Sequence, residues 1–265
     1  MTMQPGPRGS RRAFLAIGGL TLLSACASEG RPAAGPSPGP PAPSVPPSAP
    51  PSAPPTPPAP TRIAVQRKPL YALPASAARK GTKVVALTLD DGPDPAYTPQ
   101  VLKILHKHHV TATFFVIGQT AAAHPDLLRS IVDGGHTVGT HTWSHANLRK
   151  LNAAKVRTEI QRAVDTVASI TGTVPHLFRA PYGNWSRTVF KECAALGQNS
   201  IAWDVDPRDW ETPGSNHIRS AVLNQVGNRS IVLTHDGGGD RSQTVQALRH
   251  VVPELKSSGY RFVGV

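Results

Sequence analysis

The stretch KVVALTLDDGP, residues 83–93, is an apolar run that ends in two aspartates, a glycine and a proline. A short run rich in Val and Leu predicts a buried β-strand, and Asp, Gly and Pro favour a turn after it. Polar residues follow an apolar run in the same way at four more places, His141-Thr142-Trp143-Ser144-His145, Arg179-Ala180-Pro181-Tyr182, Asp206-Pro207-Arg208-Asp209-Trp210 and Leu233-Thr234-His235-Asp236. Polar side chains at the ends of several strands are typical of barrel-like α/β enzymes, in which they assemble one site.

Strand-like and helix-like segments alternate from residue 83 onwards. Strands are predicted at 83–89, 111–117, 137–141, 176–179, 200–205, 230–234 and 260–263. Helices are predicted at 98–109, 121–133, 152–170, 186–196, 215–226 and 242–257. This alternation predicts a parallel sheet with helices outside it. An open doubly wound sheet and a distorted barrel of seven or eight βα units both fit. We favour the α/β barrel, because a doubly wound sheet concentrates its site at one switch point.

Residues 1–26 are interpreted as an export signal. Arg11 and Arg12 precede the short apolar run 16–23, a pattern that resembles a twin-arginine signal. The run is far shorter than the ~20 residues that a membrane-spanning helix needs. It ends at Leu23-Ser24-Ala25-Cys26, which resembles the lipobox of bacterial lipoproteins. Cys26 is therefore predicted to be lipidated, and an ordinary signal peptide with an incidental cysteine is the alternative.

Residues 27–69 are predicted to form a disordered linker, and residues 70–265 a single folded domain. Pro, Ala, Ser and Gly dominate residues 27–61, and such a composition cannot bury enough apolar surface to fold. The proline runs favour extended polyproline II, which rises roughly 3 Å per residue. We interpret the linker as a spacer between an anchor and a single globular domain.

The charge and cysteine content restrict the partners of the predicted domain. The chain has a formal net charge of +12, of which residues 1–61 carry +3 and residues 62–265 carry +9. Nucleic acid could neutralise such a charge, but an export signal argues against that partner, and an anionic wall or membrane surface is the expected neighbour. If Cys26 is lipidated, Cys193 has no cysteine to pair with. Its helix-like surroundings predict a buried structural thiol.

A pair of histidines and a pair of aspartates are candidate metal ligands. His141 and His145 are four residues apart, and on one helical turn this spacing places both imidazoles on the same face. Asp90 and Asp91 are adjacent at the end of a predicted strand, where neighbouring side chains can point in different directions. One carboxylate is then free to bind metal while the other faces a water molecule. The combination favours a metal site over a simple Asp-Gly-Pro turn.

Together the five segments resemble the five motifs of the polysaccharide deacetylases of carbohydrate esterase family 4, the NodB-type domain. The resemblance covers about residues 82–264. It implies a distorted (β/α) barrel that removes N-acetyl or O-acetyl groups from a polysaccharide with the help of a divalent metal. It also implies that the metal ligands are Asp91, His141 and His145. Zn²⁺ suits two histidines and one aspartate, and Co²⁺, Ni²⁺ and Mn²⁺ are alternatives.

The same resemblance implies two proton-transfer residues, each with a charged partner. Asp90 would be the general base, and the Arg179 cation would keep it ionised by lowering its pKa. His235 would be the general acid that protonates the leaving amine, and Asp209 would favour its protonated form.

The resemblance further implies residues that surround the acetyl group. Tyr182 would offer its backbone N–H to the developing oxyanion, and Trp210 and Leu233 would line the pocket for the acetyl methyl group with it. Trp143, Tyr182 and Trp185 are candidates for stacking on sugar rings, although packing in the core is expected for at least one of them.

These observations predict a lipid-anchored, metal-dependent deacetylase, a monomer on the outer face of the cell membrane, within the cell wall. The expected substrate is N-acetylglucosamine of peptidoglycan, because the anchor, the spacer and the basic domain all place the site in the wall. Chitooligosaccharides and acetylated xylan are the alternative substrates. The rival from another class is a wall-binding module without catalysis. The loss of a ligand, the base or the acid would favour that rival, and none is missing.

Overall fold

The computed structural model describes residues 63–265. The predicted export signal, Cys26 and residues 27–62 of the predicted linker lie outside the described residues. The described part contains seven strands: β1 (Lys83–Asp90), β2 (Thr113–Val116), β3 (Thr137–Thr140), β4 (Leu177–Phe178), β5 (Asn199–Ser200), β6 (Ser230–His235) and β7 (Tyr260–Phe262). They form one parallel sheet in the order β5-β4-β3-β2-β1-β6, and β7 pairs with the first half of β1.

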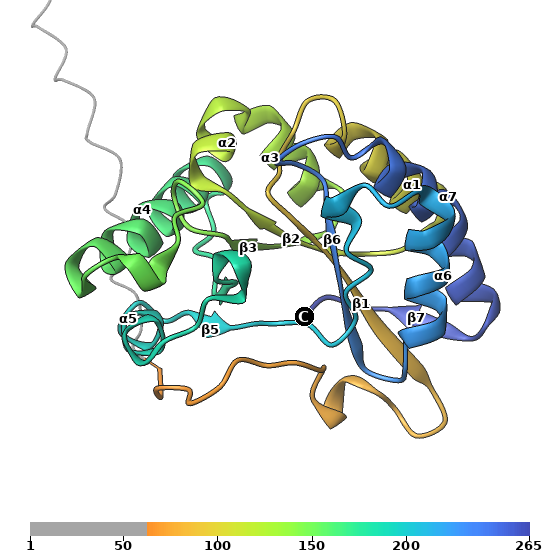
Figure 1. Ribbon diagram of the computed structural model, residues 1–265, viewed down its shortest axis with the longest axis horizontal. Coiled ribbons are helices and arrows are strands. Elements are labelled where there is room, and N and C mark those ends of the chain that lie inside the picture. Colours follow the sequence, from red (N-terminus) through yellow and green to blue (C-terminus); the bar gives the residue numbers. More distant parts are fainter. Residues whose placement is uncertain (1–62) are drawn as a thin grey trace, which may run out of the picture. The chain divides into compact units, whose positions relative to one another are not determined.

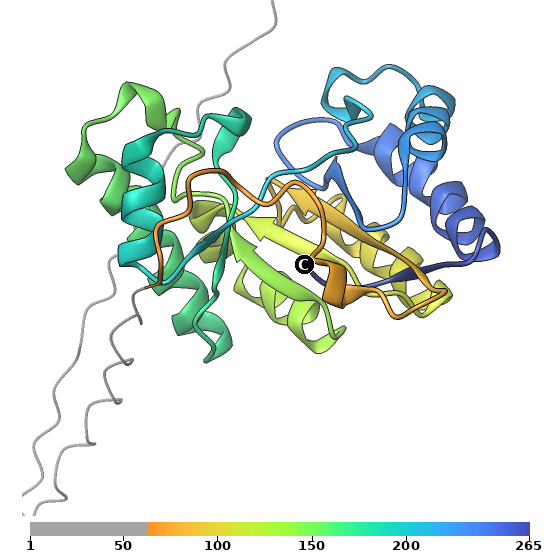
Figure 2. The same cartoon turned by 90° about the horizontal axis from the view of Figure 1, so that it is seen from below.

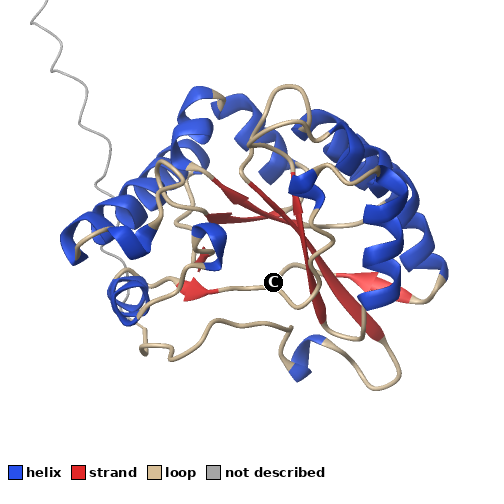
Figure 3. Ribbon diagram, viewed as in Figure 1, coloured by secondary structure: helices blue, strands red, loops and turns tan. Residues whose placement is uncertain are grey.

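Seven α-helices flank the sheet: α1 (Thr98–His108), α2 (Gly118–Ala123), α3 (Pro125–Asp133), α4 (Ala153–Thr171), α5 (Arg187–Ala195), α6 (Ser215–Gln225) and α7 (Ser242–Ser257). Four 3-10 helices occupy loops: η1 (Ala75–Ala77), η2 (Leu148–Lys150), η3 (Pro181–Gly183) and η4 (Asp209–Glu211). The sheet is curled, and the helices form an arch around its outer face (Figures 1 and 3). The predicted fold class, an α/β distorted barrel, is confirmed. Within residues 63–265, none of the helices combines the length and the apolar character that a membrane crossing requires.

The strand predicted at 200–205 is much shorter in the structure, because β5 ends at Ser200. The chain then crosses to β6, where the Asp204 carboxylate accepts hydrogen bonds from the Ser230 hydroxyl (2.8 Å) and the Ile231 N–H (2.7 Å). One residue later Val205 forms an isolated parallel bridge with Val232. The curl of the sheet thereby brings its two ends together.

Residues 63–73, here called the N-terminal strap, run between these two ends of the sheet (Figure 2). Leu70 exchanges backbone hydrogen bonds with Ser200 and Ala202, each of 2.8 Å, and Ala72 bridges to Ser230. Farther back, the Ile63 N–H donates to Ala194 at 3.0 Å. Contacts with the folded domain therefore extend back to Ile63, before the predicted domain start at residue 70.

The side chains of β1 alternate between two faces, as the pleat of a strand requires. The outer face packs with the helices through Val85, Leu87 and Leu89. The inner face begins in a small apolar cluster that contains Val84, Ala86 and Leu73 of the strap. The same alternation places Thr88 and Asp90 on the inner face, so this face becomes polar towards the carboxyl end of the strand.

The single helix predicted at 121–133 is wrong, because the structure has two helices there. α2 begins earlier, at Gly118, and ends at Ala123, and α3 begins at Pro125. Proline disfavours the helical conformation of the residue before it, and His124 has φ −131° and ψ 60°. Pro125 is well placed as the first residue of a new helix, where its missing N–H is not needed.

The packing of the strap against the inner apolar cluster should contribute to the free energy of unfolding. Leu73 is only 2% exposed and joins the inner apolar cluster, so Leu73→Ala is expected to lower the free energy of unfolding by about 2–5 kcal/mol. Tyr71→Ala is the matched control on the same strap, because Tyr71 is 51% exposed. Urea unfolding of both variants measures the difference, and equal losses would show that the inner cluster does not depend on the strap.

Candidate active site

The carboxyl ends of the central strands meet at a pocket of about 710 Å³. Asp90 at the end of β1 is the register partner of His235 at the end of β6. Thr140 of β3 is likewise paired with Phe178 of β4, so that the residues after them, His141 and Arg179, also lie close together. Of the predicted site residues, those that line the pocket are Asp90, Asp91, His141, His145, Tyr182, Trp210, Leu233 and His235. Arg179 and Asp209 are buried behind them.

Three of these side chains form a group that fits a metal ion. The donor atoms of Asp91, His141 and His145 all lie within 4.8 Å of one another. Asp91 Oδ1 lies 3.6 Å from His141 Nε2 and 3.3 Å from His145 Nε2. This oxygen is buried and has no hydrogen-bond partner among the described residues. A buried acceptor beside two imidazole nitrogens is what a divalent cation would satisfy.

The protonation of His141 also fits a metal ligand. Its Nδ1 lies 2.8 Å from the carbonyl oxygen of Arg179, which can only accept a hydrogen bond. Nδ1 therefore carries the proton, and the lone pair on Nε2 points into the pocket. Burial lowers the pKa of His141 to about 3, so the ring is neutral at physiological pH.

The two histidines meet through a loop, and the predicted helical turn is wrong. β3 ends at Thr140, and the residues after it include Thr142 with φ 67° and His145 with φ 57°, both in the left-handed region. The first turn of α2 holds this loop, because the N–H groups of Gly118 and Gln119 donate to the carbonyls of Thr142 and Trp143 at 2.9 and 3.0 Å. Spacing of four residues thus brings the imidazoles together without a helix.

Asp91 is fixed by a turn and by glycine backbone. Its φ of 71° redirects the chain directly after β1, so that Asp90 accepts from Arg179 while Asp91 faces the two histidines. Gly237 and Gly238 pack against it so closely that added Cβ atoms would lie 2.4 Å from the Asp91 carbonyl oxygen and 2.6 Å from its Oδ2. Only glycine fits at these two positions.

Asp90 and Arg179 form a buried ion pair. Arg179 donates to Asp90 Oδ1 and to the Thr88 hydroxyl at 2.7 Å each, and to the carbonyl of Ala202 at 3.0 Å. Burial raises the pKa of Asp90 above its usual value, although the charge of Arg179 opposes this shift. The predicted net lowering is therefore wrong, because desolvation outweighs the ion pair. A raised pKa makes Asp90 a better proton acceptor near neutral pH.

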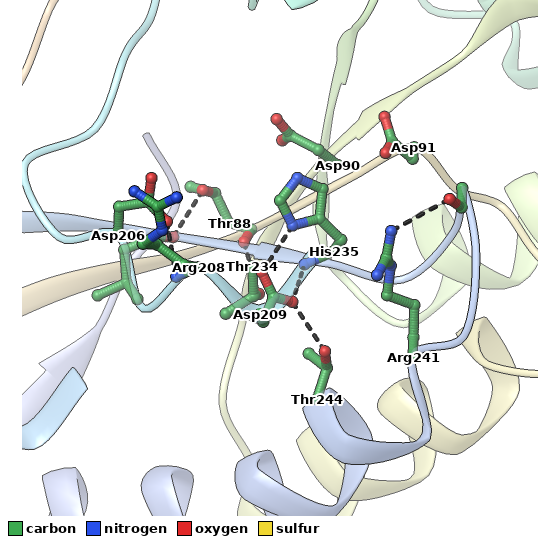
Figure 4. A network of polar contacts seen from close by, with 12 residues as sticks. Thr88, Asp90, Asp91, Asp206, Arg208, Asp209, Thr234, His235, Arg241 and Thr244 are labelled. Atoms are coloured by element: carbon green, nitrogen blue, oxygen red, sulfur yellow. Dashed lines mark hydrogen bonds and ion pairs between the residues drawn. The ribbon is translucent and has the colours of Figure 1, made fainter. Parts of the chain in front are cut away.

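His235 and Asp209 form a second buried pair (Figure 4). Asp209 Oδ1 lies 2.7 Å from His235 Nδ1, and its Oδ2 accepts from the His235 N–H at 2.9 Å and the Thr244 hydroxyl at 2.8 Å. Burial acts to lower the pKa of His235, but the hydrogen bond and charge of Asp209 raise it to about 9. His235 is thus protonated at neutral pH, with Nδ1 held by Asp209.

Aromatic side chains form the rim of the pocket. Tyr182 has φ 59° and is 64% exposed, and its ring meets the His145 ring edge-on at 4.6 Å. Trp210 is 47% exposed. Both rings are accessible from outside the pocket, and stacking of Tyr182 on a sugar stays a prediction.

The other two predicted stacking residues each have one ring face packed against another side chain. The Arg162 guanidinium lies 3.6 Å from the centre of the Trp143 ring, and Trp185 stacks on Phe190 at 5.4 Å. These side chains contribute to packing.

Comparison with known proteins decides which family this is. The family described as polysaccharide deacetylase matches residues 77–201. A peptidoglycan-N-acetylglucosamine deacetylase of Bacillus cereus is 42% identical over 187 residues, which cover 69% of this chain and 86% of the relative. The chain belongs to the polysaccharide deacetylase family.

Two further relatives agree with this assignment. A chitooligosaccharide deacetylase of a Bradyrhizobium species is 42% identical over 192 residues, 68% of this chain and 88% of the relative. The solved structure of the peptidoglycan deacetylase PdaC from Bacillus subtilis has a TM-score of 0.66 and 34% identity, and the match covers 71% of this chain and 90% of that one.

In this polysaccharide deacetylase, several pocket residues were missed by the sequence reasoning. Trp203 and Asp206 line the pocket, and Thr244 supports Asp209. Asp206 stood at the start of a quoted segment, whereas Trp203 lay inside a predicted strand and Thr244 inside a predicted helix. Neither of these two carried a local signal for the site.

Asp236 follows His235 directly in the last of the five segments. It is fully buried, and its carboxylate accepts a hydrogen bond from the Thr98 hydroxyl at 2.6 Å. Burial raises its pKa to about 7. Cys193 is buried as predicted, and burial raises its pKa to about 12, which leaves the thiol inert.

The deacetylase should lose metal affinity when Gly238 is replaced. In Gly238→Ala the new methyl group would lie 2.6 Å from Asp91 Oδ2, so the ligand must shift, and the affinity for Zn²⁺ is expected to fall about 10–100-fold. Gly172→Ala is the matched control, because Gly172 also has φ +72° but no neighbouring atom within 4 Å. Competition with a coloured chelator measures both affinities, and equal values would contradict the steric argument.

The dependence of kcat/KM on pH should reflect the protonation of His235. Catalysis that needs protonated His235 is lost as pH rises through about 9. Asp209→Asn removes the main contribution that raises this pKa, so the alkaline limit should move down towards the usual histidine value of about 6.5. Profiles of kcat/KM against pH test this, with the exposed Asp240→Asn as control. An alkaline limit that stays in place in Asp209→Asn would exclude His235 as the acid.

Proposed function

We propose that this deacetylase removes acetyl groups from N-acetylglucosamine residues of peptidoglycan. The observation that carries the proposal is the arrangement of one pocket. A metal-binding triad, a buried carboxylate with a raised pKa and a protonated histidine all meet there, and exposed aromatic rings form its rim. Relatives named as peptidoglycan deacetylases support this choice of substrate.

The proposed mechanism assigns each residue one task. Asp91, His141 and His145 would hold the metal, which when bound supplies Lewis acidity to the acetyl carbonyl and to a water molecule. Asp90 takes a proton from that water molecule while the oxygen of the water adds to the carbonyl carbon. The buried Arg179 keeps Asp90 oriented towards the pocket through the bond to Oδ1.

The second half of the reaction breaks the C–N bond. The backbone N–H of Tyr182 donates to the oxyanion, and Leu233 and Trp210 enclose the acetyl methyl group. His235 gives a proton to the nitrogen as the bond breaks, so that the products are acetate and a glucosamine residue. Asp209 holds Nδ1 of His235 and thereby aims Nε2 at the leaving nitrogen.

We further propose that the resident metal is Zn²⁺ and that the enzyme is a monomer at the outer face of the cell membrane. Two histidines and one carboxylate suit Zn²⁺, with Co²⁺, Ni²⁺ and Mn²⁺ as alternatives. Export, lipidation of Cys26 and the proline-rich spacer would place the domain within the cell wall. The net charge of +9 on residues 62–265 supports an anionic surrounding.

Chitooligosaccharides are the second candidate substrate, because a relative of equal identity is named a chitooligosaccharide deacetylase. They and peptidoglycan share the N-acetylglucosamine unit. Acetylated xylan would present an acetyl ester to the pocket where N-acetylglucosamine presents an acetamide. A non-catalytic binding module would need to lack one of the reacting groups, and all of them lie in the pocket.

The experiment is to measure acetate release from purified peptidoglycan, chitooligosaccharides and acetylxylan in parallel, with chelator and with added Zn²⁺. Chelator-sensitive release, fastest from peptidoglycan, is the expected result. Asp90→Asn should lower kcat by about 10²–10⁴-fold because the base is lost, while the bound metal remains. If Asp90→Asn releases acetate at the original rate, the assignment of the base is wrong.

A further inference from the structure

A glutamate outside the five motifs holds the loop between the two histidine ligands. Glu159 lies in α4, and its carboxylate faces residues 143 and 144. Its Oε2 accepts from the N–H groups of Trp143 (3.1 Å) and Ser144 (2.9 Å), and its Oε1 accepts from the Ser144 hydroxyl at 2.9 Å. Both carboxylate oxygens are thus engaged with the short segment that separates His141 from His145.

The conformation of this loop needs such support. Thr142 and His145 both have positive φ, which is unfavourable for residues with a side chain. The N–H groups of Trp143 and Ser144 point towards α4, where Glu159 is their acceptor. Hydrogen bonds from N–H groups to an ionised carboxylate are stronger than those between neutral groups.

The loop is clamped from two sides. The first turn of α2 binds its carbonyl groups, at Thr142 and Trp143, and Glu159 of α4 binds its N–H groups. His141 is additionally fixed by Arg179 and by its place after β3. Among residues 63–265 the ring of His145 makes no such hydrogen bond; it contacts Asp91 and the rings of Tyr182 and His141, so its position depends on the loop.

We propose that Glu159 is a positioning residue of the metal site. It holds residues 142–145 in the turn that brings Nε2 of His145 to 3.3 Å from Asp91 Oδ1. It contacts neither metal nor substrate and acts through the histidine loop alone. The inference rests on the metal site of the proposed function and is independent of which glycan the enzyme uses.

Glu159→Ala in the full chain tests the proposal through Zn²⁺ binding, measured by competition with a coloured chelator. The affinity is expected to fall about 10–100-fold, as it does when groups that orient metal ligands are removed. In Glu159→Gln the amide oxygen can accept both N–H groups and the NH₂ can donate to Ser144 Oγ, so the affinity should be restored. With saturating Zn²⁺, kcat of Glu159→Ala should recover towards that of the unchanged enzyme.

Glu192→Ala is the matched control. Glu192 is also a partly buried helical glutamate, and it pairs with Arg157 at 3.2 Å in the contact between α4 and α5, away from the histidine loop. It should leave the Zn²⁺ affinity unchanged. An equal loss in Glu192→Ala, or unchanged affinity in Glu159→Ala, overturns the proposal.

A second variant guards against failure of Glu159→Ala to fold. Ser144→Ala removes one of the three hydrogen bonds and should weaken Zn²⁺ binding less than Glu159→Ala. In the double variant it should add nothing further, because its partner is gone. Unchanged affinity in Ser144→Ala, or a further loss when Ser144→Ala is added to Glu159→Ala, would contradict the clamp. Zn²⁺ binding without any acetate release would refute the proposed function and leave this inference standing.

Discussion

The buried ion pair between Arg179 and Asp90 is the interaction on which the rest of the site depends. Arg179 is fully buried, and a guanidinium without partners inside a protein costs several kcal/mol. The fold supplies three partners from two segments, Thr88 and Asp90 of β1 and the carbonyl of Ala202 after β5. The ring of Phe115 covers one face of the cation at 4.1 Å. Ala202 is held in turn by Leu70 of the N-terminal strap, so a segment far from the pocket contributes to the orientation of Asp90.

Environment, and not residue type, gives the polar groups of the pocket their separate chemistry. Burial lowers the pKa of His141 to about 3, because its Nδ1 faces the carbonyl of Arg179 and not a carboxylate. A neutral imidazole suits a metal ligand. Asp209 raises the pKa of His235 to about 9 despite similar burial, which suits a proton donor. Asp91 itself is left-handed (φ 71°), so that its neighbour Asp90 accepts from Arg179 while Asp91 faces the histidines. Groups whose pKa values are pushed apart in one pocket are typical of acid–base sites.

The sequence predicted the order of elements and the members of the site better than it predicted their local conformations. Strands such as β1 and β6 carry continuous apolar runs, and their shared register could be inferred from the polar residues at their ends. The end of β5 at Ser200 could not be predicted from the sequence, because Asp204 redirects the chain through side-chain hydrogen bonds to β6. Glu159 and Thr244 act from helices, where a polar residue is ordinary and nothing local marks it. Predicting the sign of the pKa shift of Asp90 requires knowing how deeply the carboxyl is buried, and only the packed structure supplies that.

Strained backbone conformations explain why the sequence did not predict the shapes of the loops in this site. Among the described residues, five of the eight non-glycine residues with positive φ lie in the five polar segments, namely Asp91, Thr142, His145, Tyr182 and Arg208. Each such conformation costs about 1–3 kcal/mol, a large share of the ordinary 5–15 kcal/mol of domain stability. The turns therefore exist because neighbouring elements impose them. Gly237 and Gly238 pack closely against Asp91, and α2 and Glu159 hold the histidine loop through hydrogen bonds. The residues that would bind the metal and the residues that would set how tightly it binds are consequently different sets, and only the first set is visible as a motif.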